Sequence, residues 1–209
     1  AAMSIWEEIK NILNNFPLKS SYQINRMRPP GSCDEQMFMK LCVRCARCVE
    51  ACPYRVLRRS SATKNGEIGT PYIYADVAGC QLCMKCTSVC PTGAIDSSTV
   101  EMQQAAIGVA RINEDTCMNY LYSKVESGEI EPTGSMAICN SCLNSCPLRE
   151  EAIYLKDGII PSITEKCTGC GLCVERCPVK PVKAIAVIPK GMPDAETAGY
   201  FHYLKRIGK

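Results

Sequence analysis

Residues 167–178 read Cys167-Thr168-Gly169-Cys170-Gly171-Leu172-Cys173-Val174-Glu175-Arg176-Cys177-Pro178. The cysteines stand at C-x2-C-x2-C-x3-C-P, the spacing with which bacterial ferredoxins hold cubane iron–sulfur clusters. In two-cluster ferredoxins the fourth thiolate of such a run binds the neighbouring cluster rather than its own. The proline after that cysteine cannot continue a helix and restricts the residue before it, so the fourth thiolate is directed away from the other three.

The same spacing recurs twice, and a fourth copy is stretched by an insertion. The intact copies place Cys42, Cys45, Cys48 and Cys52 before Pro53, and Cys80, Cys83, Cys86 and Cys90 before Pro91. The stretched copy has Cys117 alone, followed later by Cys139, Cys142 and Cys146 before Pro147. With Cys167, Cys170, Cys173 and Cys177, sixteen of the seventeen cysteines are candidate metal ligands of four [4Fe-4S] clusters. Cys33 has no motif spacing, and we predict that it binds no metal.

Two other uses of cysteine fit this pattern poorly. Disulfide frameworks belong to secreted chains shorter than about 100 residues, whereas this chain has 209 residues. Structural zinc sites use pairs of cysteines, often with histidine, and the single histidine, His202, lies far from every run. Consecutive triplets with an outlying fourth cysteine therefore favour cubane clusters.

The rest of the chain lacks the motifs of bond-making catalysis. It has no G-x-G-x-x-G for a dinucleotide, no P-loop and no Cys/His nucleophile pair. We therefore expect an electron-transfer subunit without a catalytic centre of its own. Aromatic residues do not interleave with the basic ones, so nucleic acid is not an expected partner. No apolar run approaches the roughly 18 residues that cross a bilayer, so no transmembrane segment is expected.

Charge is distributed unevenly along the chain. Residues 1–64 carry eleven Lys/Arg against five Asp/Glu, and residues 65–209 carry thirteen against sixteen. Five arginines gather around the first run, at positions Arg44, Arg47, Arg55, Arg58 and Arg59. They form either an ordinary solvated face or a positive field that eases cluster reduction or docks an acidic partner.

The periodicity of apolar residues predicts an α+β fold of short elements. Residues 3–16 form an amphipathic helix, with a second short helix over residues 35–40 and a third near 195–207 in the tail. An apolar pair follows each fourth cysteine: Val56-Leu57, Ala94-Ile95, Ala152-Ile153 and Ala184-Ile185. Extended segments precede three runs, at 72–76, 110–115 and 162–165. We expect these to form small hairpins that cover clusters, with loops or insertions at 58–71 and 118–138.

The spacing alone does not decide which runs share a module. The gaps between successive runs are of similar length, 27, 26 and 20 residues. We expect residues 1–31 to form an N-terminal helix and a stiff linker, residues 32–188 a four-cluster body, and residues 189–209 a tail.

Several segments resemble the NapG/MauM family of ferredoxin-type proteins over residues 26–188. The matching features are Arg28-Pro29-Pro30-Gly31, Cys42-Val43-Arg44-Cys45-Ala46-Arg47-Cys48-Val49-Glu50-Ala51-Cys52-Pro53-Tyr54, Gly69-Thr70-Pro71-Tyr72, Cys90-Pro91-Thr92-Gly93-Ala94, Cys117-Met118-Asn119-Tyr120-Leu121 and Cys167-Thr168-Gly169-Cys170-Gly171. Two features depart from the family. The second run lacks extra residues between its second and third cysteines, and the third run carries a longer insertion.

The resemblance implies two interlocked, nested two-[4Fe-4S] modules. The first run (42–53) would pair with the fourth (167–178), and the second (80–91) with the third (117–147). Cys177 would then complete the cluster of Cys42, Cys45 and Cys48, and Cys52 that of the fourth run. Likewise, Cys146 would complete the cluster of the second run, and Cys90 that of the third.

The resemblance also implies a function in electron transport. The chain would pass single electrons from a membrane quinol dehydrogenase to a periplasmic redox enzyme or cytochrome. It would lie in the periplasm, held at the membrane of a respiratory complex by a partner, and Ala1-Ala2 fits the removal of an export signal. Two alternatives stay open: a permanently bound subunit of a molybdopterin oxidoreductase, and a redox-sensing or scaffold protein with structural clusters. A cytoplasmic location is the alternative to the periplasm.

Overall fold

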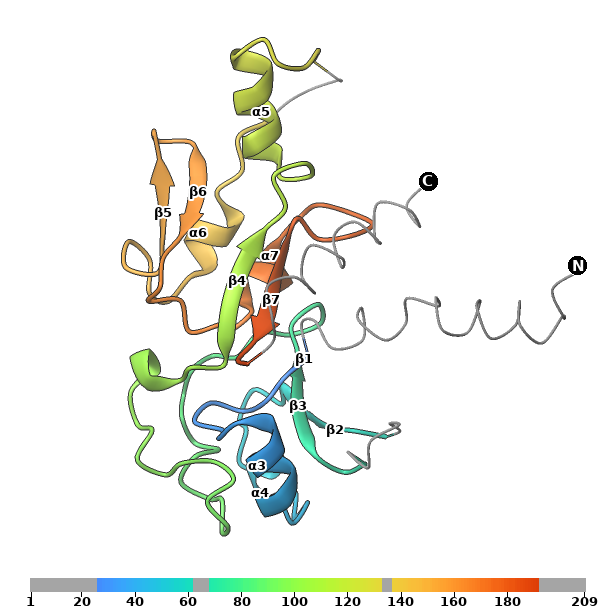
Figure 1. Cartoon of the computed structure of the whole chain (residues 1–209), viewed down its shortest axis with the longest axis vertical. Coiled ribbons are helices and arrows are strands. Elements are labelled where there is room, and N and C mark those ends of the chain that lie inside the picture. Colours follow the sequence, from blue (N-terminus) through green and yellow to red (C-terminus); the bar gives the residue numbers. More distant parts are fainter. Residues whose placement is uncertain (1–25, 62–67, 133–136, 192–209) are drawn as a thin grey trace, which may run out of the picture.

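The computed structural model describes residues 26–61, 68–132 and 137–191, drawn in colour in Figure 1. They form two modules, one above the other along the long axis of the molecule. Each module is built from small antiparallel sheets and short helices, which agrees with the predicted α+β class. The helices predicted over residues 3–16 and 195–207 lie outside the described residues.

The lower module contains a three-stranded sheet and two short helices. Strand β3 (Pro71–Tyr74) lies between β1 (Arg26–Met27) and β2 (Leu57–Arg59), and both neighbours run antiparallel to it. The helices are α3 (Glu35–Leu41) and α4 (Arg47–Glu50), and a 3-10 turn, η1, covers Met102–Gln104. The Asp34 side chain caps α3 by accepting a 3.0 Å hydrogen bond from the Met37 N–H. Helix α3 confirms the helix predicted over residues 35–40.

The upper module contains two separate pairs of antiparallel strands. Strand β4 (Gly108–Ile112) pairs antiparallel with β7 (Ile185–Pro189), and β5 (Ile153–Lys156) pairs with β6 (Ile160–Ile163). Its helices are α5 (Met118–Glu126), α6 (Ser141–Ser145) and α7 (Leu172–Arg176). Helices α4, α6 and α7 each carry the third cysteine of a run, Cys48, Cys142 and Cys173.

Both modules follow one chain path: strand, cysteine run, hairpin, cysteine run, strand. In the upper module β4 precedes the third run and pairs with β7, which follows the fourth. In the lower module Ser32 precedes the first run and bridges Ile95, which follows the second. The nested pairing of runs is therefore wrong. The strand pairs close each module around two consecutive runs, because the hairpin between those runs turns the chain back beside itself.

The predicted apolar pairs form the centre of each module. Val56-Leu57, Ala94-Ile95, Ala152-Ile153 and Ala184-Ile185 are all buried, with at most 6% of each residue exposed. The extended segments predicted before three runs are also confirmed, since they overlap β3, β4 and β6. Burial of these pairs supplies the hydrophobic stabilisation that small sheets of this size need.

Two stretches fold differently from the expectation. Residues 26–31 are packed into the body instead of forming a linker: Met27 is fully buried, and Arg28 donates hydrogen bonds to Glu35 (2.8 Å) and the Pro71 carbonyl (2.9 Å). The insertion at 118–138, expected to be marked by turns, contains helix α5. Its apolar residues Met118, Leu121 and Val125 recur at helical spacing, a signal that the turn residues later in the insertion obscured.

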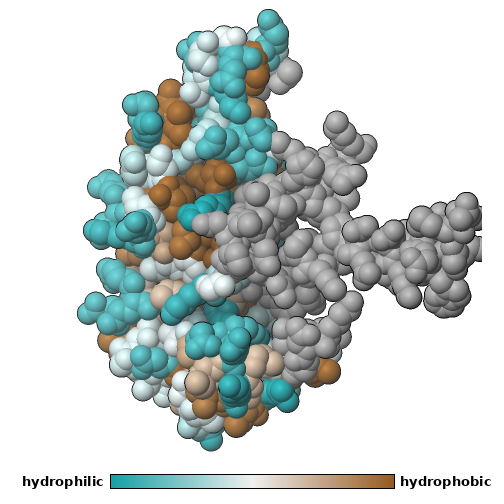
Figure 2. Space-filling view, viewed as in Figure 1, coloured by the Kyte–Doolittle hydropathy of each residue, from teal (hydrophilic) through white to brown (hydrophobic). Residues whose placement is uncertain are grey.

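In the view of Figure 2, brown residues gather at mid-height beside the grey atoms, and teal residues lie along the opposite edge. Within residues 26–61, 68–132 and 137–191, the helices are too short or too polar to cross a lipid bilayer.

Candidate functional site

The sixteen cysteines of the runs line four cavities. We number each cavity by the run that supplies three of its cysteines. Cavity I is lined by Cys42, Cys45, Cys48 and Cys90. Cavity II is lined by Cys80, Cys83, Cys86 and Cys52. Cavity III is lined by Cys117, Cys139, Cys142 and Cys177. Cavity IV is lined by Cys167, Cys170, Cys173 and Cys146, and Cys142 also touches it.

The fourth cysteine of each run lies in the cavity of the other run of its own module. Cys52 and Cys90 are exchanged between cavities I and II, and Cys146 and Cys177 between cavities III and IV. The nested assignment, which placed Cys177 with the first run and Cys52 with the fourth, is therefore wrong. So is the placing of Cys146 with the second run and Cys90 with the third.

The apolar pairs give independent support for this exchange. Each pair lines the same cavity as the fourth cysteine that it follows. Ala94-Ile95 thus joins Cys90 in cavity I, and Val56-Leu57 joins Cys52 in cavity II. Ala152-Ile153 and Ala184-Ile185 do the same in cavities IV and III. Each cavity is thus a ring of sulfur donors closed by a buried apolar wall.

The backbone of the three intact runs is left-handed on both sides of the middle cysteine. Positive φ angles occur at Arg44 and Ala46 around Cys45, at Leu82 and Met84 around Cys83, and at Gly169 and Gly171 around Cys170. Only the fourth run uses glycine, so the other two hold ordinary residues in a conformation that costs roughly 1–2 kcal/mol each. Such strain persists where the surrounding structure requires it, typically at functional sites.

This left-handed geometry suits a bound anion. Alternating right- and left-handed residues turn successive backbone N–H groups toward one concavity, and such concavities bind anionic groups including iron–sulfur clusters. Within the described ranges, no three Cys, His, Asp or Glu side chains converge closely enough for a single metal ion. Four thiols around a cavity, rather than around a point, fit a cubane cluster.

Burial keeps several of these thiols protonated in the absence of a cluster. Burial raises the pKa of Cys48 and Cys142 to about 11, with a smaller contribution from neighbouring thiols. At Cys90, hydrogen bonds from Thr92, Ile95 and Ala94 outweigh the effect of burial and lower the pKa. Cluster binding therefore has to displace protons from the buried thiols, which couples metal binding to pH.

The four cavities are neighbours in the order I, II, IV, III. Burial raises the pKa of Cys86 in cavity II to about 12, with further contributions from Cys80 and from Cys48 of cavity I, so these two cavities lie near each other. Cavities III and IV share Cys142. The row follows the long axis of Figure 1, where α4 of cavity I and α5, which follows Cys117 of cavity III, lie at opposite ends.

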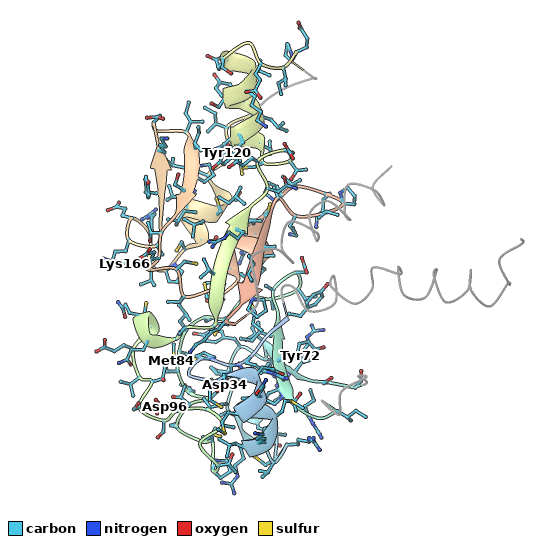
Figure 3. All side chains as sticks on the ribbon, viewed as in Figure 1. Asp34, Tyr72, Met84, Asp96, Tyr120 and Lys166 are labelled. Carbon is cyan, nitrogen blue, oxygen red and sulfur yellow. The ribbon has the colours of Figure 1, made fainter. Side chains whose placement is uncertain are left out.

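Cavities II and IV meet across the boundary between the modules. The Cys80 N–H donates a 2.7 Å hydrogen bond to the Cys170 carbonyl, and the Gly79 N–H donates a 2.8 Å hydrogen bond to the Glu175 carboxylate. A Cβ atom on Gly79 would lie only 2.5 Å from the Leu172 nitrogen, so no larger residue fits there. Figure 3 shows Met84 of cavity II in the part of the lower module nearest this boundary.

Asn119 closes the gap in the stretched third run. Its fully buried side chain accepts a 2.7 Å hydrogen bond from the Cys139 N–H and donates one of 2.6 Å to the Ile159 carbonyl. The amide thereby ties helix α5, the returning chain at Cys139 and the β5–β6 turn together. No motif in the sequence indicates this role, although Asn119 lies in a segment that carries the family resemblance.

Lys183 brings a positive charge to the end of the fourth run. Its Nζ donates hydrogen bonds to the carbonyls of Cys177 (2.8 Å) and Glu175 (3.1 Å), at the C-terminus of α7. Cys33 lies outside the four cavities, and its N–H and Sγ both donate to the Ala94 carbonyl, at 3.2 and 3.4 Å.

Family models match the two pairs of runs separately. A 4Fe-4S dicluster domain matches residues 41–94, and a second one matches residues 137–178. The first range lies in the lower module, and the second lies in the upper module, beginning after Cys117. Two dicluster domains account for four [4Fe-4S] clusters in the chain.

Curated relatives cover most of the chain. The methylamine utilization ferredoxin-type protein MauM of Methylorubrum extorquens is 35% identical over 182 residues, which cover 82% of this chain and 76% of that protein. MauM of Paracoccus denitrificans is 35% identical over 83% of this chain and 77% of its own length. The ferredoxin-type protein NapG of Escherichia coli is 31% identical over 85% of this chain and 77% of its own length.

Proposed function

Since the chain belongs to the family of ferredoxin-type proteins that includes MauM and NapG, we propose that it relays single electrons through four [4Fe-4S] clusters in cavities I to IV. Three cysteines of one run and the fourth cysteine of its partner run hold each cluster. The ligand sets are Cys42, Cys45, Cys48 and Cys90; Cys80, Cys83, Cys86 and Cys52; Cys117, Cys139, Cys142 and Cys177; and Cys167, Cys170, Cys173 and Cys146. The cysteine-lined cavities support this assignment.

When bound, each cluster supplies a one-electron couple whose potential depends on burial and on hydrogen bonds to sulfur. The chain's own N–H groups provide those hydrogen bonds. The Leu82 N–H lies 3.4 Å from Cys80 Sγ, and the Ala110 N–H lies 3.4 Å from Cys167 Sγ. These N–H groups stabilise the negative thiolates and favour reduction of the clusters that they contact.

The continuous row of cavities carries the proposal of a relay. Neighbouring cavities lie close together at each step. The Cys48 thiol of cavity I acts on Cys86 of cavity II, Cys80 of cavity II is hydrogen-bonded to Cys170 of cavity IV, and Cys142 lines both cavities III and IV. A protein with purely structural clusters needs no such row. The two ends, cavities I and III, are where electrons enter and leave.

The partners follow from the family resemblance. The donor is a membrane quinol dehydrogenase, and the acceptor is a redox enzyme or cytochrome. The chain works in the periplasm, held at the membrane by its partner.

An anaerobic redox titration followed by electron paramagnetic resonance tests the relay. Four clusters that are reduced and reoxidised reversibly support it, whereas clusters that stay in one oxidation state support a scaffold. Assays with the purified holoprotein and a quinol should show no steady turnover, because the chain has no motif for a two-electron cofactor. Steady quinol oxidation by the chain alone would contradict this part of the proposal.

A further inference from the structure

Five exposed arginines lie in the lower module, and two of them line cavity I, at the end of the row. We call Arg44, Arg47, Arg55, Arg58 and Arg59 the arginine face; all five are exposed. Residues 40–59 carry six Lys/Arg, and the only acidic residue among them is Glu50. This stretch concentrates the positive charge of the first 64 residues at one place in the fold.

The arginines lie together rather than around the module. Helix α4, which begins at Arg47, packs beside strand β2, which carries Arg58 and Arg59. Arg44 and Arg59 approach each other at Gly69, where each has an atom 3.6 Å from the position of an added Cβ. Arg44 and Arg47 also line cavity I itself.

The same face exposes a cluster ligand and apolar side chains. At cavity I, Cys45 is exposed and Val43 is 61% exposed; Tyr54, which lines the neighbouring cavity II, is 56% exposed. Charged rims steer two proteins together, and a few apolar contacts then hold a small transient interface. A redox protein seated here would lie directly over cavity I.

The other end of the row carries the opposite charge. Residues 114–131, around and beyond helix α5, contain Lys124 and five exposed acidic residues: Glu114, Asp115, Glu126, Glu129 and Glu131. An acidic protein is therefore attracted to the end at cavity I and repelled from the α5 end. The opposite charges of the two ends select which partner meets which cluster.

We propose that the arginine face docks an acidic redox protein, which exchanges one electron at a time with the cluster of cavity I. This inference rests on the proposed relay, because it names the partner of one of its ends. In each exchange one electron moves between the partner's reduced centre and the oxidised cluster, so one is oxidised as the other is reduced.

The test measures electron transfer from a reduced plant-type [2Fe–2S] ferredoxin, used as an acidic probe, to the oxidised holoprotein. The double variant Arg47→Glu/Arg58→Glu reverses two charges on the face. Arg47 is the first residue of α4 and Arg58 is exposed on β2, so neither change opens the core. The control Lys156→Glu/Lys190→Glu makes the same change in net charge at exposed positions in the upper module.

We expect the second-order rate constant at low salt to fall about tenfold or more in the arginine variant, and less than about twofold in the control. The difference should shrink as ionic strength rises. Equal rates in both variants, or rates that do not respond to salt, would overturn the proposal. It would also be overturned if the holoprotein bound vesicles of anionic phospholipid through these arginines while the ferredoxin kinetics stayed unchanged.

A redox titration of the same variants separates this inference from the relay. If four reversible clusters are present but the arginine variant reacts like the wild type, only the docking surface is wrong. If fewer than four clusters titrate in every variant, the relay itself is wrong.

Discussion

The backbone N–H of Cys80 donates a hydrogen bond of 2.7 Å to the carbonyl oxygen of Cys170. These two cysteines belong to different modules and to different cavities, II and IV. Burial raises the pKa of Cys170 to about 12. A backbone hydrogen bond from Leu172 acts in the opposite direction, and the neighbouring thiols, Cys80 among them, raise the pKa further. This contact joins the two ferredoxin-like modules, so that their cavities form one row.

Glu175 should hold the two modules in register at this contact. Glu175→Ala removes the carboxylate that accepts the hydrogen bond from the Gly79 N–H. The free energy of unfolding should therefore fall by about 1.5–3 kcal/mol, the range for a hydrogen bond to a charged group. Glu175→Gln keeps an acceptor oxygen and should lose less. Pulse reduction followed by absorbance should show slower electron equilibration between the modules in the alanine variant.

Glu50→Ala is the matched control for this prediction. Glu50 has the same place in the first run as Glu175 in the fourth, but it is exposed. If electrons equilibrate between the modules at the wild-type rate in both alanine variants, the Glu175 carboxylate does not hold the contact between the modules in place.

Because the fourth cysteines are exchanged, removing one should perturb the cluster of the other run in its module rather than the cluster of its own run. Cys90→Ala should perturb the cluster of Cys42, Cys45 and Cys48, and Cys52→Ala that of the second run. The spectrum of each variant, compared with one lacking a central cysteine such as Cys45→Ala, identifies which cluster changes. Matching spectra for Cys90→Ala and Cys45→Ala are expected. Matching spectra for Cys52→Ala and a variant of the fourth run would restore the nested arrangement.

Asn119 should be needed to assemble cavity III. Asn119→Leu leaves the Cys139 N–H and the Ile159 carbonyl without their hydrogen-bond partner. Each unsatisfied buried group should destabilise the folded state by about 1–3 kcal/mol. Iron content should therefore fall from about sixteen atoms per chain toward about twelve. Asn144→Leu, which changes an exposed residue of α6, should retain the full content. Full iron content in Asn119→Leu would show that the split run closes without this amide.

Lys183 should raise the reduction potential of the cluster held by Cys177. Its ammonium group contacts the Cys177 carbonyl, and a nearby positive charge favours the reduced, more negative cluster. Lys183→Met should therefore lower one potential in a redox titration, while Lys180→Met, at an exposed position, should leave all of them nearly unchanged. Equal shifts in the two variants would indicate a general charge effect instead of this contact.

Local sequence signals predicted the cysteine runs and the elements beside them, but not which runs share a module. The cysteine runs, their apolar pairs and the strands before them were predictable because each depends on a few adjacent residues. The partner of each run depends on the pairing of β4 with β7, whose residues are more than 70 positions apart. The similar gap lengths gave no information on that pairing, and the resemblance suggested the nested alternative.

Individual contacts across the modules were also hidden from the sequence. Glu50 and Glu175 occupy equivalent places in their runs, yet of the two only Glu175 reaches the other module, because the fourth run lies at the boundary and meets the second run there. In the fourth run, Gly169 and Gly171 hold the left-handed backbone, a conformation that glycine adopts readily. The same backbone at Arg44, Ala46, Leu82 and Met84 could not be predicted, since these residue types rarely adopt it.

The most direct test of the row is an anaerobic crystal structure of the holoprotein with iron located by anomalous scattering. The account predicts four clusters along the long axis, with the two middle ones on either side of the Cys80–Cys170 hydrogen bond. The cluster of Cys42, Cys45, Cys48 and Cys90 should lie at one end, and that of Cys117, Cys139, Cys142 and Cys177 at the other. Fewer than four clusters, or a first-run cluster completed by Cys177, would contradict it.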